Sequence, residues 1–391
     1  MDTSDLHIIN CDFKEILLAV LIFLACQPVF VWNYGITYAL SSALIFVFFF
    51  NRVDTKRNGN IFFLFVFCSA YLLLPILRSS NIATVLMYLA FAIIPCLDSK
   101  IIKGAYDYFR VLLIITFSLS IITLILIFIG VPLSYSVIEP INQLKQYSYI
   151  YYPFLLIPTY VEDGSFARFC SVFDEPGAVG TLAGLILSVE NYNIKRYGNL
   201  IIFAAGCLSA SLYFVVISFA YMFFFYQGKS KYYFVLFILL LYLITKDIDV
   251  FQRLVWDRIA LSNSGKFQGD SRNTEEILKA FDELKYDFRI LFGMGANYVD
   301  KIAGGSASIQ VFILRDGFVF VLLFLCGYIL MALRYIKNRK SLLFFVSFVL
   351  IGTLYQRPGF CNPDFLFLFT AFIFFHDESR EDVNIGCSGL L

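Results

Sequence analysis

Long apolar runs recur along nearly the whole chain and limit what it can fold into. A bilayer offers the backbone no hydrogen-bond partners, so a segment that crosses it is a helix of roughly 20 apolar residues. The alternating pattern of membrane β-strands is absent. The runs predict about twelve transmembrane helices, at residues 15–33, 34–50, 61–77, 81–97, 109–131, 176–190, 199–210, 211–226, 232–245, 317–335, 341–356 and 360–375.

Composition agrees with these runs. Of the 391 residues, 60% are hydrophobic and only 15% are charged, whereas soluble domains carry about 25% charged residues. The formal net charge of +1 gives no basic surface for nucleic acid. We predict an all-α integral membrane protein that forms a single polytopic domain over residues 1–391 and contacts membrane lipid. Met1–Asn10 lacks the basic region of a cleaved signal peptide, so we expect the first span to be retained.

Metal-binding patterns are weak in this sequence. Asp247 and Asp249 have a spacing that divalent cations use, but acids at a helix end are usually solvated. Five of the nine cysteines fall inside apolar runs, where cysteine acts as a small hydrophobic residue. We predict no metal, no cofactor and no disulfide framework.

The short connections predict the orientation, because lysine and arginine are enriched on the cytoplasmic side. With twelve spans, both termini and all five basic connections fall on that side. Residues 199–226 would make one helix of about 42 Å, longer than a membrane core, so we predict a hairpin that breaks near Ser209–Ser211. The basic connections contain Arg52, Lys56 and Arg57; Lys100, Lys103 and Arg110; Lys195 and Arg196; Lys229 and Lys231; and Arg334, Lys337, Arg339 and Lys340.

Two long segments remain on the outer side, at residues 132–167 and 246–305. The first contains the tyrosine-rich stretch Tyr147–Pro153. The second is too long for a simple connector, and loops of this length are often functional. Within it, apolar residues recur at helical spacing over 274–284, which predicts a helix lying on the membrane surface.

A charged stretch precedes the predicted span at 176–190. Asp174, Glu175 and Pro176 suit the start of a helix, where acids and proline are favoured, and capping is one interpretation of the two acids. Capping does not explain Arg168. An arginine beside a helix N-terminus can bind a phosphate or pyrophosphate group, although an arginine that snorkels to the membrane interface is the alternative.

Three further motifs lie in or next to the outer segment 246–305. They are Ser271-Arg272, the glycine turn Phe292-Gly-Met-Gly295, and Arg315-Asp-Gly317 at the start of a span. Together with Arg168 and Phe173-Asp-Glu-Pro-Gly177, this order of motifs resembles the O-antigen polymerase (Wzy) family of bacterial glycosyltransferases. The resemblance covers residues 165–335 by pattern and the whole chain by topology.

The resemblance implies an enzyme that polymerises undecaprenyl-pyrophosphate-linked oligosaccharides at the periplasmic face of the bacterial inner membrane, and it suggests contact with a chain-length regulator. Segments 132–167 and 246–305 are then periplasmic. The pyrophosphate leaving group needs cations, and the acceptor hydroxyl needs a carboxylate. We therefore expect catalytic roles for Glu175, Asp174 and Arg168. The expected substrate-binding residues are Arg272, Arg315, Arg289, Arg357, Gly293 and Gly295.

Three other functions stay open at this point. An O-antigen ligase is similar in topology but uses a histidine on the outer side, where this chain reads Ser306-Ala-Ser-Ile-Gln310. The two histidines, His7 and His376, map to the cytoplasmic tails. A flippase for the same lipid-linked sugars would also have about twelve spans, but transporters commonly show repeated halves and charges within spans. A membrane scaffold without catalysis is the third alternative.

Overall fold

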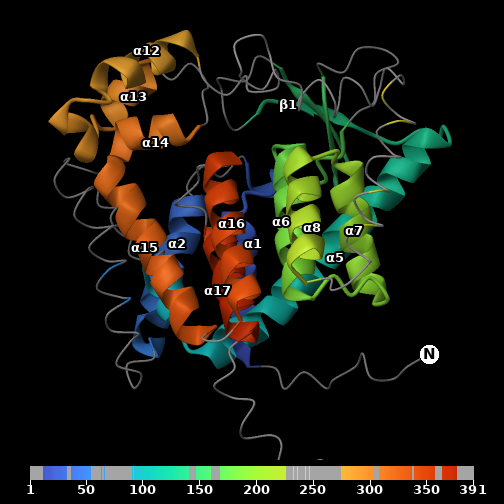
Figure 1. The fold of residues 1–391 in the computed structure, drawn as a ribbon. Helices are drawn as coiled ribbons and strands as arrows, with labels where there is room; N and C mark the ends of the chain where they lie inside the picture. The colour runs from blue at the N-terminus through green and yellow to red at the C-terminus, as the bar shows by residue number, and fades with distance from the viewer. Residues whose placement is uncertain are drawn as a thin grey trace, which may run out of the picture.

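The computed structural model describes residues 12–32, 37–53, 92–140, 147–159, 168–225, 274–302, 308–336, 339–356 and 363–376, together with residues 63, 66, 90, 232, 236, 243 and 246. Helices make up most of this part of the chain, and they form an upright bundle with smaller elements across its upper end (Figure 1).

Nine of the described helices coincide with predicted spans. Only α5 and α15 are long and apolar enough to cross a membrane, and the other seven have 12 to 17 residues. A helix of 12 residues is about 18 Å long, so the described helices do not amount to twelve full spans. Spans 61–77, 81–97 and 232–245 lie mostly outside the described residues. The nine are α1 (Phe13–Ala25), α2 (Thr37–Phe49), α5 (Ser99–Phe128), α6 (Pro176–Val189), α7 (Tyr197–Leu208), α8 (Leu212–Phe225), α15 (Phe318–Tyr335), α16 (Lys340–Gln356) and α17 (Pro363–Phe375).

The hairpin predicted within 199–226 is confirmed. Helix α7 ends at Leu208 and α8 begins at Leu212, with Ser209 as the C-cap of α7. Ala210 adopts a left-handed backbone conformation with φ of 45°, which reverses the chain. Both helices pack on α6, where small residues allow a close approach, as is common in membrane helix packing.

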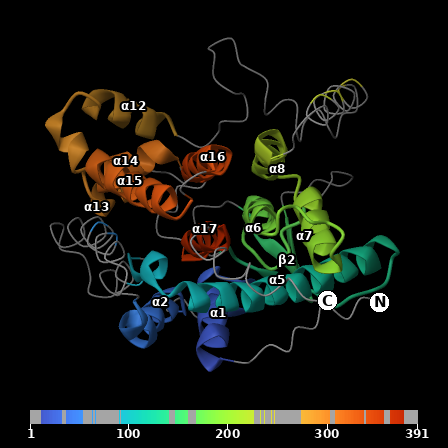
Figure 2. The same ribbon diagram turned by 60° about the horizontal axis from the view of Figure 1, so that its bottom comes forward.

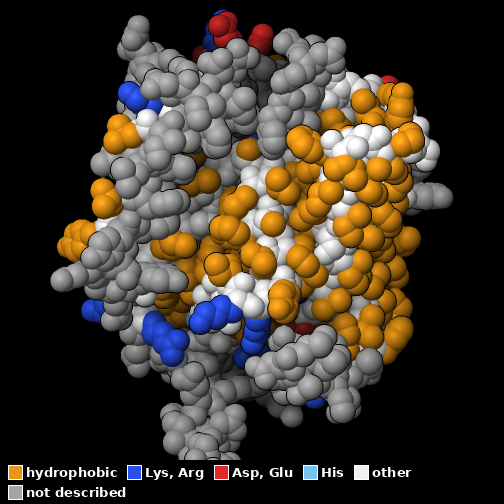
Figure 3. All heavy atoms as spheres, turned by 90° about the vertical axis from the view of Figure 1, so that its right-hand side faces the viewer, with side chains coloured by type: hydrophobic (Ala, Val, Ile, Leu, Met, Phe, Trp, Pro, Cys, Tyr) orange, Lys and Arg blue, Asp and Glu red, His pale blue; other side chains and the backbone are white. Residues whose placement is uncertain are grey.

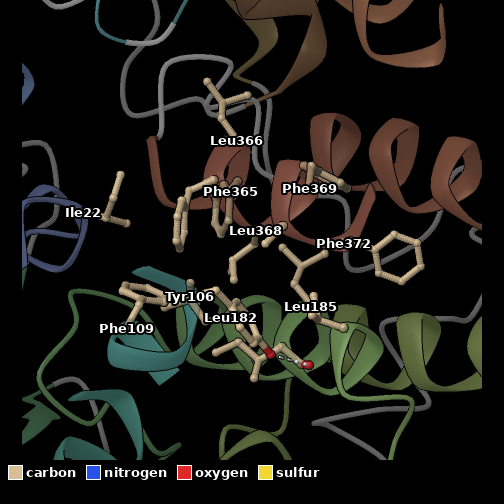
Figure 4. Close-up of a cluster of buried hydrophobic side chains, with 14 of the residues drawn as sticks. Ile22, Tyr106, Phe109, Leu182, Leu185, Phe365, Leu366, Leu368, Phe369 and Phe372 are labelled. Atoms are coloured by element: carbon tan, nitrogen blue, oxygen red, sulfur yellow. Dashed lines mark hydrogen bonds between the residues drawn. The ribbon is translucent and has the colours of Figure 1, made fainter. Parts of the chain in front are cut away.

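Helix α17 occupies the centre of the bundle, between α5, α6 and α15 (Figure 2). Phe365 and Leu368 point toward side chains of α5 and α6 (Figure 4). On other faces of the helix, the Phe369 ring packs against Tyr328 of α15 and the Phe372 ring against Phe345 of α16. Aromatic rings pack edge to face between α17 and α5. The centroids of the Phe109 and Phe367 rings lie 5.6 Å apart at an interplanar angle of 78°. This apolar interior fixes the relative positions of the helices that carry the site.

An apolar stripe runs along the outward side of α5. Val111, Ile115, Ile122 and Ile125 are each 42% to 53% exposed, and their spacing places them on one helix face. On the side shown in Figure 3, hydrophobic side chains cover the described surface on the right over most of its height. A face of this kind suits contact with lipid tails rather than with water.

The described basic connections meet at one end of the bundle. The Asp98 amide donates to the Arg52 carbonyl, which joins the connection after α2 to the start of α5. His376, after α17, places Nε2 3.3 Å from Asn191 Oδ1, after α6. Most lysine and arginine side chains visible in Figure 3 lie at this lower end. The connections after α2, at the start of α5 and after α6 therefore lie at one end of the bundle, whereas Lys229 and Lys231 lie outside the described residues. That this end faces the cytoplasm stays a prediction.

A buried carboxylate organises this lower end. Glu190, at the end of α6, has a side chain that is 8% exposed and lies 3.0 Å from the Arg196 guanidinium. The Arg110 guanidinium lies 3.7 Å away on its other side and also donates to Asn199. The network ties α5, α6 and α7 together.

A three-stranded antiparallel sheet lies at the opposite, upper end (Figure 1). Ser120 and Thr123 of α5 donate hydrogen bonds to carbonyls of the β2–β3 turn and hold the sheet over the bundle. The prediction of an all-α fold is wrong here, because the tyrosine-rich part of 132–167 favours strands. The strands are β1 (Ser136–Ile138), β2 (Tyr149–Tyr152) and β3 (Leu155–Pro158).

Four short helices within or beside segment 246–305 form a second packed unit at the upper end (Figure 1). The helix predicted at 274–284 is confirmed as α12, but its apolar face does not lie on a membrane. Ile277, Ala280 and Leu284 are buried against residues of α13 and α14. The helices are α12 (Glu275–Leu284), η6 (Phe288–Leu291), α13 (Ala296–Ile302) and α14 (Ile309–Asp316).

Candidate functional site

The segment that leads into α6 is held by three other parts of the chain. Its residues 169–173 are all buried. The amides of Val29 and Leu156 donate to the carbonyls of Val172 and Ser171, each at 2.8 Å. The amide of Phe169 donates to the Leu208 carbonyl at the end of α7. The backbone on which the predicted catalytic residues sit is therefore rigidly placed.

Arg168 has structural partners that the sequence did not indicate. Its Nε donates to the Ser209 carbonyl and its Nη2 to the Ala210 carbonyl, both at 3.2 Å. A helix C-terminus attracts a cation, so Arg168 stabilises the turn between α7 and α8. A contact between Arg168 and a phosphate stays a prediction.

Glu175 takes the N-cap position of α6 without capping it. Its backbone is extended, with φ of −147° and ψ of 140°, and its side chain makes no capping hydrogen bond. Pro176 follows as the first helical residue, as the sequence predicted. A capping hydrogen bond therefore does not explain Glu175, although its position at the helix N-terminus favours an acid. Asp174 precedes it, and both acids are half-buried at the upper end of α6.

Tyr149 of β2 connects the sheet to this segment. Its hydroxyl donates to the Asp174 carbonyl, and the residue is fully buried. The Trp32 and Tyr147 rings lie against it at 5.6 Å and 5.4 Å. Burial, and then the nearby Asp174 carboxylate, raise the pKa of Tyr149 far above its usual range, so the hydroxyl stays a donor. The tyrosine-rich stretch was the only sequence signal for it.

A third carboxylate near this end was missed. Asp364 lies in the first turn of α17 and is 6% exposed, beside the Cys26 thiol that follows α1. The chain continues from Cys26 to Val29, which binds the segment that leads into α6. The sequence Asn362-Pro363-Asp364 reads as an ordinary helix start, which gives no indication of a buried acid.

The glycine turn and the Arg-Asp-Gly motif are in direct contact. The Met294 amide donates to the Leu314 carbonyl at 2.6 Å, and the Gly295 amide donates to the Arg315 carbonyl at 3.0 Å. A Cβ at Gly293 would lie 2.6 Å from the Gly317 nitrogen, so only glycine allows this approach. Two motifs that are 20 residues apart in the sequence thus form one unit at the start of α15.

The described arginines of this unit are paired with acids. Arg315 lies 2.9 Å from Asp316 and stacks 4.2 Å from the centre of the Phe312 ring. Arg289 lies 2.6 Å from Asp287, and this hydrogen bond lowers the pKa of the Asp287 carboxyl. A phosphate would compete with these carboxylates for both guanidiniums.

Several predicted residues lie outside the described part of the chain. They are Arg272 and Arg357, two of the predicted substrate-binding arginines, and the Asp247 and Asp249 pair. Among the residues that the structure describes, no group of three or more histidine, cysteine or acidic side chains could hold a metal ion.

The predicted site residues that the structure describes therefore fall into two groups. Arg168, Asp174 and Glu175 share the segment before α6, whereas Gly293, Gly295 and Arg315 share the start of α15, with Arg289 close by in η6. Both groups lie at the upper end of the bundle (Figure 1). No protein-family model, curated protein or solved structure matches the chain.

Proposed function

We propose that the chain is a membrane glycosyltransferase that polymerises undecaprenyl-pyrophosphate-linked oligosaccharide units into a surface polysaccharide such as O-antigen. The observation that carries the proposal is the gathering of both motif groups at one end of the bundle, opposite the basic connections. In this proposal the upper end faces the periplasm, the lower end faces the cytoplasm, and the protein crosses the bacterial inner membrane many times.

The apolar surface supports a membrane location. Helices α5 and α15 are long and apolar enough to span a bilayer, and α5 presents a continuous apolar stripe outward. The described helices between 12 and 17 residues would cross as parts of longer spans or in a locally thinned bilayer. Twelve spans is our proposal for the complete chain.

The reaction that we propose is a displacement at an anomeric carbon. The acceptor hydroxyl oxygen forms the new glycosidic bond, and the bond from that carbon to the pyrophosphate oxygen breaks. Undecaprenyl pyrophosphate leaves with the electron pair, and the hydroxyl proton passes to a carboxylate. We assign that carboxylate to Glu175, because it lies at the upper end of α6 seven residues after Arg168, and we keep Asp174 as its neighbour on the acceptor side.

The cations in this mechanism neutralise the leaving group. Arg168 lies seven residues before Glu175 and is oriented by two carbonyls, so its guanidinium has a defined direction. Arg315 would bind phosphate oxygens by exchanging its contact with Asp316 for a stronger anion. Arg272, Arg289 and Arg357 are further candidates for the same task.

The test uses purified protein in proteoliposomes with undecaprenyl-pyrophosphate-linked oligosaccharide. A polymerase produces a ladder of longer lipid-linked glycans without any other acceptor. A ligase forms product only when a lipid A core is added, and a flippase moves the substrate across the bilayer without lengthening it. Two results would contradict the proposal: transfer of the substrate across the bilayer without a ladder, or product formation only when the lipid A core is added.

A further inference from the structure

An exposed aromatic corner links η6 to the start of α15. Tyr286, Phe288, Phe292 and Phe318 are 91%, 72%, 45% and 43% exposed. The Phe288 and Phe292 rings meet edge to face, with centroids 5.7 Å apart. Large apolar rings that cluster on a surface mark a site of contact with another apolar phase or partner.

The corner sits at the upper end of α15. The backbone of Phe292 lies so close to Gly317 that a Cβ on the glycine would be 2.5 Å from the Phe292 carbonyl carbon. Phe318 follows directly and is the first residue of α15. The rings are therefore fixed beside the point where a membrane-length helix begins.

The corner continues an apolar stripe on α15. Leu322, Leu330 and Leu333 are each 41% to 45% exposed, and with Phe318 they follow helical spacing along one face. If α15 crosses a bilayer, this face contacts lipid. The aromatic corner then lies at the level where the lipid tails meet the head groups.

The corner is not part of the interior of its own unit. The core of that unit is made by Ile277, Ala280, Leu284, Val299, Val311 and Leu314. The most exposed rings instead alternate with two basic side chains, Lys285 and Arg289, which are 40% and 62% exposed. Aromatic rings mixed with basic residues are typical of the interface of a membrane, where head-group phosphates lie above the tails.

We propose that Tyr286, Phe288, Phe292 and Phe318 form an aromatic anchor that inserts into the phospholipid interface beside α15. The anchor holds the unit of α12 to α14 at a fixed height over the bilayer. This inference rests on the proposed crossing of α15. In this proposal the aromatic corner contacts lipid, whereas the apolar face of α12 is covered by α13 and α14.

Tryptophan fluorescence in brominated lipid tests the anchor. Both native tryptophans, Trp32 and Trp256, are replaced by phenylalanine, and the full chain is reconstituted in phosphatidylcholine vesicles. One tryptophan is then introduced by Phe288→Trp at the anchor, by Cys326→Trp near the middle of α15, or by Lys279→Trp on the polar face of α12. Bromine is carried either near the head group or deep in the tails.

We expect shallow bromine to quench Phe288→Trp at least twofold more than deep bromine does, and deep bromine to quench Cys326→Trp more. Lys279→Trp is expected to show little quenching by either. Quenching of Cys326→Trp without quenching of Phe288→Trp would overturn the anchor and leave the crossing of α15 intact. If neither Phe288→Trp nor Cys326→Trp is quenched, both the crossing of α15 and the anchor are overturned. If Lys279→Trp is quenched as strongly as Phe288→Trp, the anchor is not specific to the aromatic corner.

Discussion

Gly317 is the position where one methyl group should do most damage to the candidate site. Its φ of 92° and ψ of 157° lie in a region that is open essentially to glycine alone. A Cβ there would lie 2.5 Å from both the Leu291 oxygen and the Phe292 carbonyl carbon. Both are backbone atoms that cannot rotate away, so Gly317→Ala forces the glycine turn off the start of α15.

The expected cost combines two contributions. A non-glycine residue in this conformation costs about 1–3 kcal/mol. The displaced turn also loses the hydrogen bonds from the amides of Met294 and Gly295 to α14, at roughly 0.5–1.5 kcal/mol each. We therefore expect Gly317→Ala to lower the free energy of unfolding by about 2–6 kcal/mol.

Gly130→Ala is the matched control. Gly130 has φ of 80°, and an added Cβ would meet nothing within 4 Å, so this variant carries backbone strain without a collision. It should cost about 1–2 kcal/mol. Unfolding of the purified protein in mixed micelles, titrated with dodecyl sulfate, measures both. An equal loss for the two variants would refute the docking of the glycine turn against Gly317.

Three further predictions concern single side chains. Glu190→Gln leaves the partly buried Arg110 without its carboxylate and should lower stability by about 1–3 kcal/mol in the same titration; an unchanged midpoint would contradict the network. Tyr149→Phe removes the hydroxyl that binds the Asp174 carbonyl and should cost about 1–3 kcal/mol, and a neutral result would contradict that bond. Burial lowers the pKa of His376 from its ordinary 6.5, so the unfolded chain binds the proton more readily and stability falls as pH drops below about 6.5. His376→Gln should flatten that part of the pH profile of unfolding, and an unchanged profile would contradict the assignment.

The predictable parts of the fold were those that depend on length and local pattern. The break between α7 and α8 followed from a 28-residue apolar run with basic residues at both ends. Helix α12 was predicted from apolar residues at helical spacing. The same spacing suits an apolar face that packs on protein and one that lies on a membrane, so it could not predict which of the two the helix contacts. Strand β2 was missed because its partners, β1 and β3, are only 3 and 4 residues long and give no alternating pattern of useful length.

The candidate site was predictable only as a set of motifs. The sequence indicated Gly293, Gly295 and Arg315 as functional, but their contact depends on a chain reversal that no local pattern specifies. The partners of Arg168 lie 41 and 42 residues further along the chain, so its structural role could not be read from its neighbours. Buried Asp364 was missed because its sequence context is that of an ordinary helix start.

The most direct measurement compares one chemical change at the two ends of α6. Glu175→Gln removes the carboxylate charge at the upper end, where we propose that the acceptor hydroxyl is positioned. Glu190→Gln removes the same charge at the lower end, outside the proposed site. Polymer formation from lipid-linked oligosaccharide is measured in proteoliposomes with equal amounts of folded protein. We predict that Glu175→Gln slows polymer formation about a hundredfold or more, while Glu190→Gln keeps the wild-type rate per folded molecule. Polymer at the wild-type rate from Glu175→Gln would contradict the central claim.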